Sequence, residues 1–258
     1  MRILRLSHSG DTHPGVPEAK RSFSLTAQAI EAATGEPVET TCRVVWPRRE
    51  VPDLVDSWIE RYRPDIVIFW LNCYWFTYLN IPEYGRSTPR VLKAVGRLAK
   101  RVHIKKAVVS RAATLRLRVL DSQVRGRESF EPHQVIALSE AVIRRVLQHE
   151  EVSLIVRGSE WSSPVHSPAV ATAAILARAE SRRLAVHREV GGLCERLHVP
   201  YFGVEDGLQY ARDGLLCPDS IHPSARTHAN MAAQETAAIL DIWRASGAGR
   251  AATARNRG

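Results

Sequence analysis

The chain has 258 residues and contains 36 Lys and Arg against 27 Asp and Glu, which gives a formal net charge of +9 at pH 7. Hydrophobic residues make up 45% and charged residues 24% of the chain, an ordinary globular composition that excludes a disordered polyelectrolyte and a compositionally biased repeat protein. We therefore expect a single domain over residues 1–245, followed by a disordered Gly/Ala/Arg-rich tail at 246–258.

Strand-like apolar runs and helix-like periodicities alternate along the chain, and this alternation indicates an α/β fold. The run 66–71 is apolar at every position, as is typical of a strand buried on both faces of a parallel sheet. We predict strands at about 2–6, 38–46, 66–71, 152–156 and 199–204, separated by helices at about 23–33, 52–62, 134–148 and 169–197 and followed by a helix at 224–243. Residues 82–151, between the third and fourth strands, are too many for a simple crossover and predict a basic helical insertion.

No window of about 18 apolar residues is present, and the N-terminal segment becomes polar after Leu6. The sequence therefore predicts neither a membrane span nor a signal peptide, and we expect a cytoplasmic location. The cysteines are widely spaced, without a Cys-x-x-Cys or Cys/His grouping, so we expect reduced packing residues, no metal and no cofactor. Dinucleotide-binding, P-loop and zincin motifs are also missing from the sequence.

Polar residues occupy three places where a parallel α/β sheet positions its ligands, beyond the carboxyl ends of the strands. Ser7-His8-Ser9 follows the first predicted strand, Asn72 follows the third, and Asp219-Ser220-Ile221-His222-Pro223 precedes the last helix. A serine, an amide and an Asp-x-x-His pair can supply a nucleophile, an oxyanion donor and a base with its orienting carboxylate. A turn can fold the Asp219 carboxylate onto Nδ1 of His222, which leaves Nε2 to take a serine proton.

These residues resemble the motifs of the SGNH (GDSL-like) hydrolase family, and the resemblance spans roughly residues 2–243. Its carriers are the segments ILRLSHSGD, PDIVIFWLN and DSIHPSARTHANMAAQ, of which the DxxHP followed by a helix is the most specific. The resemblance implies a three-layer α/β/α, flavodoxin-like domain with a five-stranded parallel sheet. It also implies Ser9 as nucleophile, Asn72 as oxyanion donor, His222 as general base and Asp219 as the partner of that base.

The sequence departs from the family pattern in two places. The family's Gly-Asp-Ser is here Ser7-His8-Ser9, and the second-block glycine that donates a backbone N–H to the oxyanion has no counterpart. The expected position holds Trp46-Pro47-Arg48-Arg49, where proline has no N–H and the Arg48 amide is the remaining candidate. Because the loss of one donor typically lowers the rate by roughly 10²–10³, a slow enzyme and an inactive binding protein both stay open as alternatives.

Thr12, in Gly10-Asp11-Thr12, is a rival nucleophile. We prefer Ser9, because the first strand loses its apolar character at Ser7 and the family's nucleophile follows its strand closely.

Seven of the 17 aromatic residues lie within 69–84, around Asn72. We take Tyr74 and Trp75, together with Arg48 and Trp161, as candidate substrate-binding residues, with core packing as the alternative for the aromatic cluster. Residues 100–127 hold nine basic side chains and one acidic one. A solvated basic face is the simplest interpretation, and a docking surface for an acidic partner such as an acyl carrier protein is the alternative; the lack of a nucleic-acid motif argues against nucleic acid.

The sequence thus predicts a serine hydrolase that acts on an ester or thioester through an acyl-serine intermediate. Water as acceptor gives an esterase or deacylase, and an alcohol acceptor gives an O-acyltransferase. The alternative is a catalytically degenerate SGNH-like binding protein with a basic docking surface. Substrate identity and oligomeric state do not follow from the sequence.

Overall fold

The computed structural model describes residues 1–80, 127–158, 160–161, 164, 172–217 and 221–246. Five parallel strands form its central sheet, in the order β2-β1-β3-β6-β7. They are β1 (Arg2–Ser7), β2 (Glu39–Val44), β3 (Ile66–Trp70), β6 (Ser153–Arg157) and β7 (Tyr201–Phe202). The predicted five-stranded parallel sheet is confirmed, and this strand order is that of flavodoxin-like folds.

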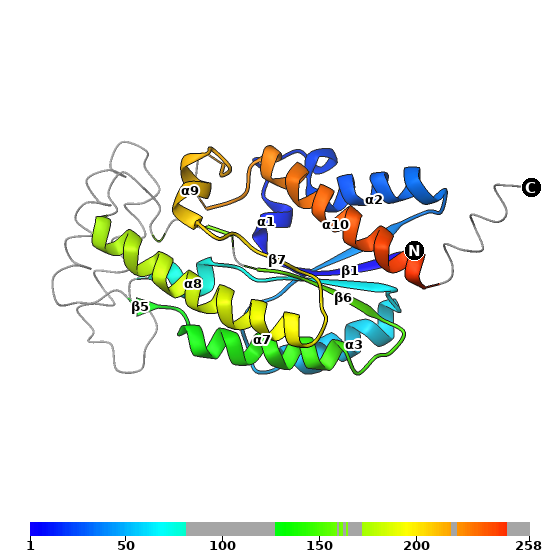
Figure 1. Ribbon diagram of the computed structural model, residues 1–258, viewed down its shortest axis with the longest axis horizontal. Helices are drawn as coiled ribbons and strands as arrows, with labels where there is room; N and C mark the ends of the chain where they lie inside the picture. The colour runs from blue at the N-terminus through cyan, green and yellow to red at the C-terminus, as the bar shows by residue number, and fades with distance from the viewer. Residues whose placement is uncertain (81–126, 159, 162–163, 165–171, 218–220, 247–258) are drawn as a thin grey trace, which may run out of the picture.

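Helices cover both faces of the sheet (Figure 1). One layer contains α2 (Ser22–Thr34) and α10 (Ala225–Ala245), and the other contains α3 (Val51–Tyr62), α7 (Pro132–Val146) and α8 (Ala173–Arg196). Because side chains alternate along a strand, Leu4 and Leu6 of β1 pack toward α3, α7 and α8, whereas Ile3 packs toward Ile30 and Ile239 of the other layer. The central strand β3 is buried at every position, as its apolar run predicts.

The helices that border the candidate site begin and end at residues with clear structural roles. Helix α2 ends at Gly35, whose φ of 73° is the left-handed conformation that terminates many helices. Helix α10 begins after Ser224, whose side chain accepts a hydrogen bond from the Thr227 N–H. This cap fixes where the chain leaves the loop that carries His222.

Short elements complete the described fold: α1 (Ser9–Thr12), the 3-10 helix η1 (Glu18–Lys20), α4 (Tyr74–Thr77) and α9 (Gly207–Arg212). A second sheet, absent from the sequence-based prediction, pairs β4 (Leu79–Asn80) antiparallel with β5 (Arg127–Glu128). None of the described helices combines the length and the apolar character needed to cross a membrane.

The second half of the predicted insertion at 82–151 contains α7. Helix α7 packs against α3 and α8, and Val135, Val142 and Val146 belong to the core, so this helix is an ordinary crossover helix of the domain. Its buried apolar stripe is the reason, because that stripe needs the sheet as its partner. The basic stretch within 81–126 and the tail at 247–258 lie outside the described residues.

Candidate active site

Ser9 and His222 lie next to each other at the carboxyl edge of the sheet. The Ser9 Oγ is 3.0 Å from the His222 Nε2, although the two residues are 213 positions apart in the sequence. This distance is within the range for proton transfer between a hydroxyl and an imidazole. Ser9 is the first residue of α1 and is separated from β1 by His8 alone, and its side chain is exposed, so the hydroxyl is open to an approaching ligand.

The loop that carries His222 is held at both sides of the histidine. Leu216 and Pro223 form an isolated antiparallel bridge, and the Cys217 N–H donates to the His222 carbonyl at 2.7 Å. Because the backbone around His222 is hydrogen-bonded to Leu216 and Cys217, the position from which the imidazole extends into the site is fixed. Asp219, the expected partner of Nδ1, lies outside the described residues.

A second histidine, His13, lies face to face with His222. The ring centroids are 3.9 Å apart and the planes differ by 13°. The His13 Nδ1 accepts a hydrogen bond from the Gly15 N–H at 3.2 Å, which orients the ring. Sequence reasoning assigned no role to His13, and its closeness to Ser9 in the chain was the one signal that could have pointed to it.

Asn72 follows β3 and has a defined side-chain orientation. Its Oδ1 accepts a hydrogen bond from the Tyr74 N–H at 2.9 Å. An amide whose oxygen is engaged in this way presents its NH₂ group as the donor. Asn72 also lines a small pocket together with Trp161, with His8, which precedes Ser9, and with Ile221 and Pro223, which flank His222.

His8 is a further residue that sequence reasoning passed over. Its Nδ1 accepts from the Gly10 N–H at 3.0 Å and caps α1, while its ring packs on Trp70 with centroids 4.1 Å apart. Burial lowers the pKa of His8 to about 3, so the ring is neutral near pH 7. His8 occupies the middle position of Ser7-His8-Ser9, and its imidazole is uncharged near pH 7.

The expected replacement for the oxyanion glycine is not supported. Arg48 is exposed, and its backbone N–H donates to the Trp46 carbonyl at 2.7 Å. That amide is already bonded within its own loop, because the chain turns tightly on either side of Pro47. The predicted use of Arg48 as a spare donor is corrected accordingly.

The candidate substrate-binding aromatics separate into two groups. Trp161 lines the small pocket beside Asn72. Trp75 is only 1% exposed and belongs to the core between the sheet and α7 and α8, which favours the core-packing alternative for this residue. Tyr74 is half-buried and stacks on Tyr78 at 4.2 Å, outside the residues that line the pocket. The short helix α4 turns Trp75 inward, an orientation that spacing from Asn72 could not predict.

Arg5 forms a buried charged cluster beneath Ser9. Its guanidinium contacts Asp11 at 3.0 Å and Glu235 of α10 at 2.6 Å, and it donates to Ser22 of α2 at 3.1 Å. Burial alone would raise the pKa of Asp11, but the Arg5 guanidinium outweighs burial and holds that pKa below its usual value. Because Asp11 lies two residues beyond Ser9, this cluster fixes the serine loop to the helix that follows His222.

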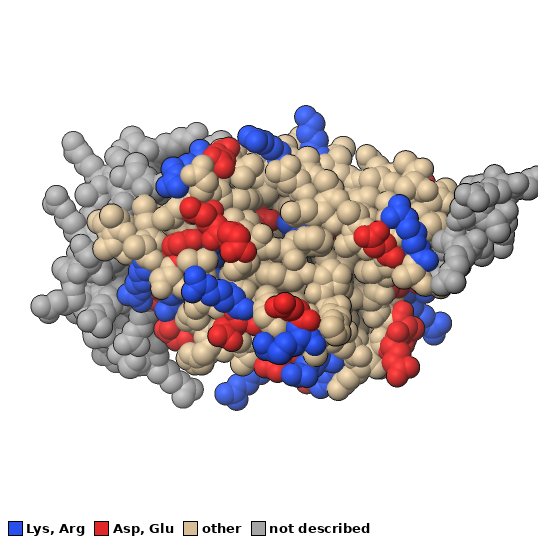
Figure 2. Space-filling view, in the orientation of Figure 1, with Lys and Arg blue, Asp and Glu red and all other residues tan. Residues whose placement is uncertain are grey.

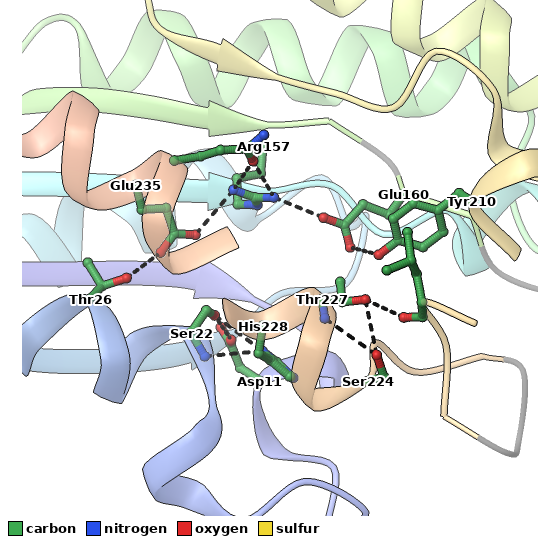
Figure 3. A network of polar contacts seen from close by, with 12 residues as sticks. Asp11, Ser22, Thr26, Arg157, Glu160, Tyr210, Ser224, Thr227, His228 and Glu235 are labelled. Atoms are coloured by element: carbon green, nitrogen blue, oxygen red, sulfur yellow. Dashed lines mark hydrogen bonds and ion pairs between the residues drawn. The ribbon is translucent and has the colours of Figure 1, made fainter. Parts of the chain in front are cut away.

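The cluster continues along the sheet toward the small pocket (Figure 3). Arg157 of β6 lies 3.6 Å from Glu235 and 2.9 Å from Glu160, and Glu160 accepts a hydrogen bond from the Tyr210 hydroxyl at 3.1 Å. Burial raises the pKa of Glu160, opposed by Arg157. Since Glu160 also lines the pocket beside Asn72, the charges of the core reach the edge of the candidate site.

His228 joins α10 to α2 in the same region. Its Nδ1 accepts from the Ser22 N–H at 3.1 Å, and burial lowers its pKa to about 4. Within the described ranges, no group of three or more His, Cys, Asp or Glu side chains is arranged to hold a metal ion.

Comparison with known proteins gives similarity in structure alone. No protein-family model and no curated protein sequence matches this chain. The structure is similar to the psychrotrophic esterase EstA from Pseudoalteromonas sp., with a TM-score of 0.52, 12% identity, and coverage of 94% of this chain and 98% of that one. It is also similar to the acetyl xylan esterase AlAXEase, with a TM-score of 0.50, 11% identity and coverage of 93% and 100%. The M. smegmatis aryl esterase gives a TM-score of 0.50 at 13% identity, with coverage of 93% and 98%.

At such low identity the similarity establishes architecture, and it does so over more than nine-tenths of the chain. The five-stranded parallel sheet of this protein, with a helical layer on each face, matches the sheet of these esterases. The chain therefore has the fold of the SGNH (GDSL-like) hydrolases.

Proposed function

We propose that this protein hydrolyses carboxylic esters through an acyl-serine intermediate on Ser9. The observation that carries the proposal is the 3.0 Å contact between the Ser9 Oγ and the His222 Nε2. A serine hydroxyl is a weak nucleophile, and an adjacent imidazole that removes its proton is the usual way to activate it. The exposure of Ser9 at the sheet edge supports access of an ester to this pair.

In the proposed reaction, the His222 Nε2 takes the Ser9 proton while Oγ bonds to the ester carbonyl carbon. The tetrahedral intermediate then breaks its bond to the alkoxy oxygen, which leaves as the alcohol with the proton from His222. Water attacks the acyl-serine and gives its proton to the same nitrogen, and collapse of the second intermediate releases the acid and returns the proton to Ser9. Asp219 is assigned the orientation of Nδ1, as the DxxH motif of the family implies.

The negative charge of each intermediate needs preorganised donors. We assign this role to the Asn72 side-chain amide, whose oxygen is engaged by the Tyr74 N–H, and to the backbone N–H of Ser9. Arg48 is left out, because its amide bonds to Trp46. With one family donor lacking, we expect a modest turnover.

Two observations favour ester hydrolysis over the alternatives. The three compared proteins are esterases by name. A binding protein that had lost its chemistry would have no need to keep the serine and histidine in hydrogen-bond contact. Thioester cleavage, transfer to an alcohol and docking of an acidic carrier protein stay predictions; the basic segment on which the docking rests is almost entirely outside the described residues.

A fluorophosphonate probe tests the proposal directly. We expect covalent labelling of the folded protein, loss of labelling in Ser9→Ala, and a fall in p-nitrophenyl acetate hydrolysis of about 10³-fold or more in that variant. Thr12→Ala is the matched control. The Thr12 hydroxyl donates to the Ser9 carbonyl at 3.5 Å rather than to His222, so labelling should persist in that variant.

Intact mass spectrometry follows the label, and circular dichroism confirms folding of each variant. If the folded wild-type protein takes no label and hydrolyses no ester, the binding-protein alternative replaces the proposal. Labelling that disappears in Thr12→Ala but persists in Ser9→Ala would instead assign the nucleophile to Thr12.

A further inference from the structure

The stacked pair of His13 and His222 is a feature that the proposed mechanism does not use. The two imidazoles overlap with centroids 3.9 Å apart and an interplanar angle of 13°. His222 therefore has one ring face covered by another aromatic ring, while its Nε2 edge meets Ser9.

His13 is itself held firmly in place. Its Nδ1 accepts from the Gly15 N–H at 3.2 Å, and its carbonyl accepts from the Arg21 guanidinium at 3.2 Å and from the Val16 N–H at 3.3 Å. A Cβ at residue 15 would lie only 2.8 Å from the His13 Nδ1 and Cε1, so a glycine is needed for this close approach. The ring that covers His222 is thus part of an ordered loop anchored to the start of α2.

A general base of this kind has two requirements that the stack can meet. Its ring must keep Nε2 directed at the serine through several proton transfers, and it must carry a positive charge in both tetrahedral intermediates. A flat aromatic neighbour restricts rotation of the ring about its Cβ–Cγ bond, and an aromatic face is a favourable neighbour for a cation. Misplacement of a catalytic group by about 1 Å can lower a rate by about 10²-fold, so a stacked ring that keeps the imidazole in place can affect kcat.

We propose that His13 is a positioning residue that holds the His222 imidazole by face-to-face stacking in its serine-directed orientation. This inference rests on the proposed function, in which His222 is the base. The stacking surface of His13 carries the role, so another flat aromatic ring at this position should perform it.

Three variants separate stacking from other roles. His13→Ala removes the ring, His13→Phe keeps a flat ring without the imidazole nitrogens, and Gly15→Ala displaces the ring of an intact His13. His133→Ala, at an exposed position of α7, is the control. Each variant is measured for kcat and KM on p-nitrophenyl acetate, for melting temperature, and for the ¹H–¹³C shifts of the His222 ring.

We expect His13→Ala to lower kcat by about 10- to 100-fold with KM changed by less than about threefold, and His13→Phe to recover most of that loss. The kcat of Gly15→Ala should lie between the values for His13→Ala and His13→Phe. The His222 ring protons should move downfield in His13→Ala, where the shielding of the stacked ring is lost, and stay near their wild-type shifts in His13→Phe. A purely structural role would lower the melting temperature without this pattern.

Folded His13→Ala protein with wild-type kcat overturns the inference, and so does a His13→Phe variant as slow as His13→Ala. Ser9→Ala, measured in parallel, distinguishes failure of the inference on His13 from failure of the proposed function. If Ser9→Ala is inactive while His13→Ala is not, the inference alone fails. Full activity of Ser9→Ala would remove the proposed function, and the inference with it.

Discussion

His8 shows how one side chain can combine two structural tasks next to a candidate nucleophile. The Nδ1 atom satisfies the Gly10 N–H at the start of α1, and the ring covers Trp70. The capping task needs the neutral imidazole, because protonation would remove the acceptor and would also bury a charge. Burial of the ring disfavours its charged form and lowers the pKa of His8 to about 3, which keeps the imidazole neutral.

The pKa of His8 predicts a stability that declines in acid. The unfolded chain has a histidine pKa of 6.5 and the folded chain one of about 3, so below pH 6.5 the unfolded state binds a proton that the folded state does not. The contribution of His8 is complete above pH 6.5 and decreases as the pH falls toward 3. We expect His8→Asn, which keeps a capping oxygen but does not titrate, to reduce the slope of unfolding free energy against pH between 6.5 and 4.

Urea unfolding followed by circular dichroism at four pH values gives this slope. His8 contributes at most about 1.4 kcal/mol per pH unit. His133→Asn, at an exposed position, is the control and should leave the slope unchanged. An unchanged slope in His8→Asn would show that this residue is not a source of the acid sensitivity.

At the scale of elements, the charged cluster around Arg5 ties β1 and the serine loop to α10. Removal of the guanidinium would leave the buried Asp11 carboxylate without its cation and the buried Glu235 carboxylate with Arg157 alone, 3.6 Å away. Breaking a buried pair in this way typically costs about 3–5 kcal/mol. We expect Arg5→Met to lower the unfolding free energy by about this amount and to reduce ester hydrolysis, because Asp11 follows Ser9 closely.

The same helix offers a control for this variant. Arg244 and Asp241 form an ion pair at 2.9 Å on the exposed side of α10, where solvent screens the charges. Arg244→Met should change the unfolding free energy by less than about 1 kcal/mol. Equal effects of the two substitutions in urea unfolding would contradict the role given to the buried cluster.

The elements that follow local patterns could be predicted from the sequence. The apolar run from Ile66 to Trp70 indicated a strand buried on both faces, and Gly35 marked the end of α2. The three-layer, flavodoxin-like arrangement followed from the family resemblance rather than from the runs themselves, and the order of the strands was not predicted. Arg5 was hidden inside the apolar run of β1, since its partner Glu235 lies 230 positions away and no local signal connects them.

The candidate site was predictable in its motif residues and not in their surroundings. Ser9 and His222 follow from motifs that place polar residues after strands and before a helix, and the structure brings them to 3.0 Å. The stacking of His13 depends on a loop conformation that begins after α1. The inward direction of Trp75 depends on α4, a single helical turn too short for periodicity to reveal.

At the scale of the whole molecule, the positive charge is concentrated in one stretch. Residues 81–126 contain 12 Lys and Arg and two Asp and Glu, so the rest of the chain holds 24 basic and 25 acidic residues. In agreement, Figure 2 shows basic and acidic side chains interspersed over the described part of the visible face. The high net charge is a property of this stretch and not of the sheet with its two helical layers.

A deletion tests whether this stretch is separable from the fold. Asn80 and Arg127 are paired across β4 and β5, so residues 81–126 can be replaced by an Asn-Gly turn that joins these two positions. We expect the shortened protein to keep a cooperative thermal transition and the fluorophosphonate labelling of Ser9. Loss of the cooperative transition would show that residues 81–126 supply part of the core.

The pairing of β4 with β5 also has an evolutionary consequence. Asn80 and Arg127, which flank the 46 residues 81–126, are paired with each other, so the number of residues between them does not affect the register of the five parallel strands. The entropy cost of closing such a loop grows only logarithmically, by about 0.6 kcal/mol for each doubling of its length. Chains that descend from a common ancestor with this protein should therefore vary most in length at this junction, where natural selection can exchange a segment without disturbing the sheet beneath it.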